Sequence, residues 1–180
     1  VWLESGSNSV QNWNNRRIER ALSTSDQPQR MTVTALWELP LARTGPRLYR
    51  AALGGWQVNS MITLTSGDVI SITQAGVPFG GNRPNVVGDP GIDNPSIDRW
   101  FNTNAFSIIP AFTFGNVARN LPRTRSDGQF NWDFSVLKSV AITERVKVQL
   151  RGEFFNFTNT PTFGNPNGNA SNAAFGRVTT

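Results

Sequence analysis

The stretch VKVQLRGEFFNFTN, residues 146–159, decides the fold class of this chain. Its first six residues alternate, with Val146, Val148 and Leu150 on one side of an extended strand and Lys, Gln and Arg on the other. A period of two is typical of a β-strand whose faces meet unlike environments. A phenylalanine cluster follows at one end only. The stretch therefore predicts a strand with one apolar face, one charged face and an aromatic end.

Three further stretches show the same alternation. They are RMTVTALWELP (30–40), GWQVNSMITLTSG (55–67) and NWDFSVLKSVAIT (131–143). Only the residues TER, 143–145, separate the last of these from the opening stretch, a spacing common in β-hairpins. If Ile142 faces Val146, then Val140 faces Val148 and Phe134 faces Phe154, which puts both apolar sets on one face. The sequence thus predicts an antiparallel, all-β meander.

Composition limits the function classes. The 180 residues contain no Cys and no His, so disulfides, Cys/His zinc sites and His-based triads are excluded. The aspartates of the loops lie among Gly and Pro, where they usually form turns. We predict no catalytic residues, no metal site and no cofactor, and therefore no enzyme. The net charge of +5 and a partial match of RGEFFNF, 151–157, to an RNA-binding motif raise a nucleic-acid-binding module as a third alternative, but we expect no nucleic-acid partner.

A long segment, about residues 75–130, separates the second and third strands. It is dense in turn signals such as FGGNRPN, GDPG and DNPS, and long irregular insertions are usually functional. Within it, aromatic, amide and guanidinium groups suit ligand stacking or anionic ligands, including lipopolysaccharide phosphates. The weak ligand-binding candidates are Trp100, Phe101, Arg119, Asn120, Arg123 and Arg125.

Aromatic residues gather where the predicted strands end. The candidates for a membrane-interface position are Trp37, Trp56, Trp132, Phe154, Phe155 and Phe157. An apolar exterior, a polar lumen, aromatic girdles, and short turns opposite long loops are typical of an outer-membrane β-barrel. A soluble β-sandwich, such as a secreted carbohydrate-binding module, alternates in the same way and stays open as the alternative. Lys138, on the otherwise apolar face, favours that alternative, unless a β-bulge turns it inward.

Several sequence motifs, taken in their order along the chain, resemble one protein family. The string LPLARTGPRLYRAALGGWQVNSMITLTSGDVISI (39–72), followed by NRPNVVGDP, IDRWFNTNAF, FGNVARN and the segment 132–166, is similar to the C-terminal barrel of TonB-dependent receptors, in particular the Oar-like group. The resemblance covers roughly residues 30–178. It implies a barrel of about 22 strands in the bacterial outer membrane.

The resemblance also implies partners and boundaries. The expected partners are outer-membrane lipid and lipopolysaccharide, an unknown bulky nutrient, and the TonB complex through a plug domain that this chain lacks. Residues 1–30 are expected to be a polar loop or strand remnant, and residues 31–180 the C-terminal barrel strands and loops, truncated before the last strand. The expected fold is a partial, open outer-membrane β-barrel with one long irregular extracellular loop. Four strands cannot close, so we expect that this piece alone does not insert stably.

Overall fold

Four long antiparallel strands dominate the computed structural model, which describes residues 10–12, 14–77, 82–143 and 145–179. The first nine residues of the polar segment and Glu144 of the predicted hairpin loop lie outside the described residues. The chain divides into two units. The sheet unit comprises residues 29–65 and 129–162, and the loop unit comprises residues 1–28, 66–128 and 163–180.

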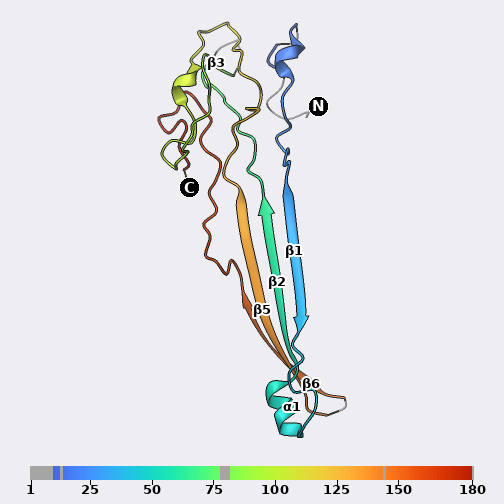
Figure 1. The fold of residues 1–180 in the computed structure, drawn as a ribbon. Coiled ribbons are helices and arrows are strands. Elements are labelled where there is room, and N and C mark those ends of the chain that lie inside the picture. Colours follow the sequence, from blue (N-terminus) through green and yellow to red (C-terminus); the bar gives the residue numbers. More distant parts are fainter. Residues whose placement is uncertain (1–9, 13, 78–81, 144, 180) are drawn as a thin grey trace. The chain divides into compact units, whose positions relative to one another are not determined.

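The sheet unit is built from β1 (Arg30–Glu38), β2 (Trp56–Thr65), β5 (Gln129–Ala141) and β6 (Lys147–Phe154). The strands pair in the order β1-β2-β5-β6, and every pair is antiparallel (Figure 1). One short helix, α1 (Arg47–Leu53), lies in the connection between β1 and β2. Apart from that helix, the unit is the predicted all-β meander.

The predicted hairpin register is confirmed. Val140 pairs with Val148 and Phe134 with Phe154, while the Ile142 amide donates to the Val146 carbonyl at 2.9 Å. All four strands lie where the alternation predicts them, with small differences at their ends. β1 and β6 each have one paired edge among the described residues, so the sheet is open.

The loop unit holds little regular structure but has its own core. It contains η1 (Arg16–Glu19), β3 (Asn85–Val86), η2 (Thr103–Ala105) and β4 (Phe106–Ser107), with β3 paired to β4. The buried core residues are Ile70, Ile72, Phe101, Val117 and Leu121. The Phe101 ring makes edge-to-face contacts with Phe106 and Phe175, at centroid distances of 5.8 and 5.2 Å. The segment predicted as irregular is therefore largely irregular in backbone and packed around aromatic side chains.

A buried ion pair ties the N-terminal segment to this core. Arg83 Nη2 lies 2.5 Å from Glu19 Oε1, with 6% and 1% of the two side chains exposed. The same carboxylate oxygen accepts from the Gln11 amide at 3.0 Å. Close backbone approach adds to this packing, because a Cβ at Gly115 would lie 2.0 Å from the Arg83 carbonyl oxygen. Residues 10–12 and 14–28 thus pack with residues 82–128 in one body.

Candidate functional site

The sheet has one face that is almost wholly apolar. Its members follow from the strand register, which brings side chains of the same parity onto one side. The apolar face comprises Met31, Val33, Ala35 and Trp37 of β1, Trp56, Val58, Ser60, Ile62 and Leu64 of β2, Phe130, Trp132, Phe134, Val136, Lys138 and Val140 of β5, and Val148, Leu150, Gly152 and Phe154 of β6.

The apolar face is exposed along the edge strands β1 and β6 and mostly half-buried along β2 and β5. Leu150 is 67% exposed, Trp37 63% and Val148 43%. A β-sandwich would bury these side chains under a second sheet about 10 Å away. The sandwich alternative is therefore wrong for this sheet. A contiguous apolar surface of this kind marks a contact with another protein or with membrane.

The two polar side chains on the apolar face are both satisfied. Trp132 Nε1 donates to Ser60 Oγ at 2.9 Å. Lys138 is 8% exposed, and its ammonium donates to the Ala52 carbonyl at 3.0 Å and to the Gly54 carbonyl. The same ammonium lies 5.1 Å from the centre of the Trp56 ring. The strand pairing continues through Lys138 without a bulge, so the bulge considered above is wrong. Hydrogen-bonded polar groups are what a hydrocarbon environment requires.

The opposite face is polar. It comprises Arg30, Thr32, Thr34, Leu36 and Glu38 of β1, Gln57, Asn59, Met61, Thr63 and Thr65 of β2, Gln129, Asn131, Asp133, Ser135, Leu137, Ser139 and Ala141 of β5, and Lys147, Gln149, Arg151 and Glu153 of β6. Arg151 and Glu153 form an ion pair, while Asp133 Oδ1 accepts from the Asn156 amide at 3.0 Å. Thr34, Asn59 and Asp133 line a shallow hollow on this face. Such a surface suits a water-filled lumen.

The strand length matches a membrane. The ten residues of β2 extend about 31 Å, at roughly 3.4 Å per residue. At a tilt of about 40° they span roughly 23 Å, close to the apolar band of about 25 Å on outer-membrane barrels. Among the described residues, no helix is both long enough and apolar enough to serve as a membrane span.

The aromatic candidates lie at two levels of the sheet. Trp37 pairs with Val58 near the α1 end, where Trp56 begins β2. Trp132 and Phe154 lie farther from the α1 end, and both rings contact Phe157, at centroid distances of 5.2 and 6.1 Å. Phe134 also contacts Phe154 and Phe157. Phe155 is 75% exposed. The positions agree with two aromatic levels, and their role at the membrane interface stays a prediction.

The ligand candidates of the loop unit make mainly internal contacts. Phe101 and Asn120 are fully buried, and Asn120 accepts from Ser71 Oγ and donates to the Leu22 carbonyl at 2.7 Å. Arg125 forms an ion pair with Asp26 and donates to the Asp26 and Gly67 carbonyls at 2.9 and 3.2 Å. These groups hold the loop unit together.

The remaining ligand candidates are closer to the surface. Trp100 is half-buried, and its indole donates to the Arg125 carbonyl at 2.8 Å. Arg119 is half-buried and Arg123 is exposed. Of the six candidates, Arg123 alone is classed as exposed, so a ligand would reach the buried ones only after rearrangement. Their role in ligand binding stays a prediction.

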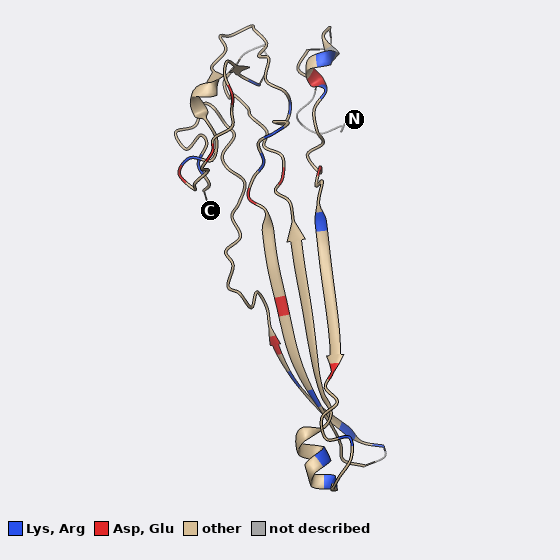
Figure 2. Ribbon diagram, viewed as in Figure 1, with Lys and Arg blue, Asp and Glu red and all other residues tan. Residues whose placement is uncertain are grey.

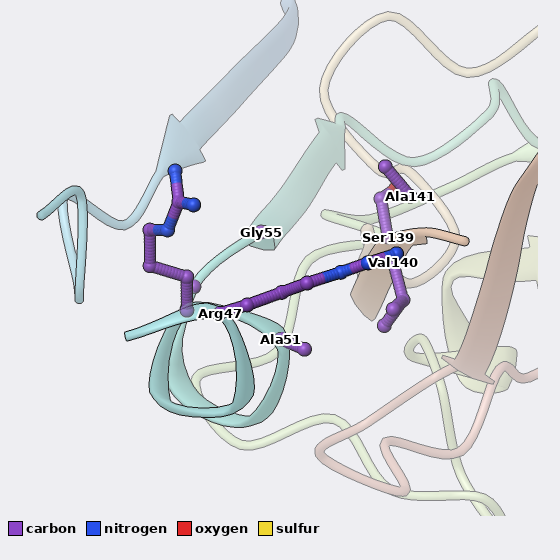
Figure 3. A pocket seen from close by; sticks show the side chains of 8 residues that line it. Arg47, Ala51, Gly55, Ser139, Val140 and Ala141 are labelled. Carbon is purple, nitrogen blue, oxygen red and sulfur yellow. The ribbon is translucent and has the colours of Figure 1, made fainter. Parts of the chain in front are cut away.

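A basic hollow at the α1 end was not predicted from the sequence. Arg47, Arg50, Ala51 and Gly55 border it on one side, and Ser139, Val140 and Ala141 of β5 on the other (Figure 3). Arg47 extends from α1 toward β5 and donates to the Ile142 carbonyl at 2.7 Å. Figure 2 shows basic residues gathered on α1 and the end of the β5–β6 hairpin. The sequence feature that could have indicated a basic helix here is the run RLYRAAL, which lacks Gly and Pro and holds two arginines three residues apart.

Comparison with known protein families identifies the kind of protein to which this sheet belongs. A family model described as "Outer membrane beta barrel domain" matches residues 2–180. Neither the search of curated proteins nor the search of solved structures found a match. Among the described residues, no group of three or more acidic residues is placed to hold a metal ion. The exposed apolar face, the polar opposite face and the family match agree: the chain belongs to the outer membrane beta barrel domain family, and its sheet is part of a barrel wall in the bacterial outer membrane.

Proposed function

We propose that this barrel wall belongs to a TonB-dependent receptor of the Oar-like group, which takes up a bulky nutrient across the outer membrane. The observation that carries the proposal is the long connection between β2 and β5, which folds around its own aromatic core. Long outer loops are common to outer-membrane barrels, but this connection also has a buried core of its own. A connection with a packed core of its own suits capture of a ligand before transport.

The order of sequence landmarks supports the same proposal. The segment 39–72, with GGWQ at 54–57, precedes the loop landmarks and the β5–β6 hairpin in the order seen in TonB-dependent receptors. In such a receptor a plug domain fills the lumen, and energy reaches it from the inner membrane through TonB. The polar face of the sheet would line the lumen around the plug. Lipopolysaccharide and outer-membrane lipid would contact the apolar face, and transport involves binding and passage without bond chemistry.

Energy dependence tests this proposal. Uptake of labelled oligosaccharides and of labelled ferric chelates would be compared in cells with the full-length protein, cells lacking it, and cells lacking TonB. The proposal predicts that uptake of one class requires both the protein and TonB, and that a protonophore abolishes it. Uptake that needs the protein but continues without TonB would identify a passive pore instead.

A further inference from the structure

We infer that α1 is an amphipathic anchor that lies in the phospholipid head-group region of the periplasmic leaflet, with its apolar side toward lipid. This inference goes beyond transport and does not rest on the proposed receptor function. It rests on the barrel wall and on the arrangement of α1 at the end of the sheet.

The two sides of α1 carry unlike residues. At about 100° per residue, Arg47, Arg50 and Ala51 share one side of the helix, and Leu48, Tyr49 and Leu53 lie on the other. Arg47, Arg50 and Ala51 border the hollow beside β5, so this side is turned toward the sheet (Figure 3). The other side points away from it, with Leu48 84% exposed, Tyr49 51% and Leu53 46%.

This arrangement is the reverse of the usual one. A surface helix of a soluble protein packs its leucines on the core and turns its arginines to water. Here Arg47 and Arg50 border the hollow beside the end of the sheet, and in the part of the chain that the structure describes Leu48 and Leu53 stay exposed. None of the residues of α1 is buried. A lipid interface explains the exposed leucines, because amphipathic helices at a membrane surface bury the apolar side about 5–10 Å into the boundary between head groups and acyl chains.

The position of α1 is continuous with the lipid-facing surface. Lys138 projects from the apolar face and donates to the carbonyls of Ala52 and Gly54 at the end of the helix. Trp56, which lies against the Lys138 ammonium, begins β2 on the same face. The hollow on the arginine side also borders Ser139, on the polar face. The helix therefore has hydrocarbon on one side and the aqueous mouth of the barrel on the other.

The leaflet follows from the loop lengths. Outer-membrane barrels have short turns on the periplasmic side and long loops outside. The β5–β6 hairpin closes between Ala141 and Lys147 at the α1 end, whereas residues 66–128 connect β2 to β5 at the other end. The α1 end is therefore periplasmic, and the lipid there is phospholipid.

Cysteine labelling tests this inference directly, because the described sequence contains no Cys of its own. Tyr49→Cys and Ala51→Cys variants of the full-length protein would each carry an environment-sensitive fluorophore. Each would be reconstituted in vesicles of phosphatidylethanolamine and phosphatidylglycerol with brominated acyl chains. Heat-modifiable migration in detergent would verify that both variants fold. Ala51 is the matched control, because at about 100° per residue it lies roughly 160° around the same helix from Tyr49.

The expected result is a blue-shifted emission at position 49 and bromine quenching several-fold stronger than at position 51. Equal quenching at both positions, or stronger quenching at position 51, would overturn the inference. No quenching at either position would also overturn it, because it would place α1 in the aqueous periplasm. Loss of nutrient uptake with an unchanged quenching pattern would affect the proposed transport function alone.

Discussion

A charged residue placed on either face of β1 should separate the lipid side from the lumen side. Ala35 and Thr34 are neighbours on β1, and the strand register puts Ala35 on the apolar face and Thr34 on the polar face. We predict that Ala35→Arg destabilises the folded barrel strongly and that Thr34→Arg has little effect. Both side chains are exposed in the sheet unit, so a steric clash does not explain a difference between them.

The depth of Ala35 in the bilayer determines how much stability the Ala35→Arg variant should lose. Ala35 pairs with Ser60, four residues along β2 from Trp56. At about 3.4 Å per residue and a tilt of about 40°, it lies roughly 10 Å into an apolar band about 23 Å thick, close to the midplane. Arginine on the lipid face costs about 2–4 kcal/mol at the midplane. At about 1.4 kcal/mol per tenfold, the folding equilibrium should fall roughly 30-fold to 700-fold.

The assay is reversible denaturant unfolding of the full-length protein in phospholipid vesicles, followed by tryptophan fluorescence. Trp37, Trp56 and Trp132 all lie on the sheet and report on its insertion. Thr34→Arg should change the free energy of unfolding by about 1 kcal/mol or less, since its side chain reaches water. Equal losses for the two variants, or a larger loss for Thr34→Arg, would refute the assignment of the faces.

Three more substitutions test packing. Glu19→Gln leaves Arg83 buried without its ionised partner, and we expect a loss of about 3–5 kcal/mol in the stability of the loop unit, measured as faster limited proteolysis of the assembled protein. Phe101→Ala empties the aromatic core of the same unit and should cost about 3–5 kcal/mol by the same measurement. Gly55→Ala should block assembly of the sheet end, because Gly55 has a φ of +70° and an added Cβ would lie 2.2 Å from the Ser139 carbonyl oxygen; heat-modifiable migration in detergent gels reports the loss.

Each of these has an outcome that contradicts it. Unchanged proteolysis of Glu19→Gln would mean that the carboxylate is not an essential partner of the guanidinium. Protection of Phe101→Ala equal to that of the unmodified protein would show that the ring does not support the core. Normal folding of Gly55→Ala would contradict the close approach of the Gly55 backbone to β5.

The sheet was predictable because its two faces meet different environments. Alternation alone locates the strands, and the hairpin register follows from the short connection between Ile142 and Val146. The face of Lys138 was also correctly predicted, but its role was not. Its partners are carbonyls of α1, a helix that the strand pattern gives no reason to expect.

The loop unit was less accessible to sequence analysis. Phe101 and Asn120 were selected because aromatic and amide groups in long loops often bind ligands. In the structure both are fully buried, where they pack and form hydrogen bonds. A segment with short, irregular elements shows no periodicity that would separate buried residues from exposed ones. Arg125 illustrates the same difficulty, because its partner Asp26 lies about a hundred residues earlier in the chain.

The orientation of the apolar face is the central claim, and site-directed spin labelling along β6 tests it most directly. A label would be placed in turn at each position from 147 to 154 of the full-length protein in lipid vesicles, and its collisions with oxygen and with a water-soluble nickel chelate would be compared. We predict a period of two, with even positions such as Val148 and Leu150 favouring oxygen and odd positions such as Gln149 and Arg151 favouring the chelate. A profile without alternation, or with the opposite phase, would contradict the account.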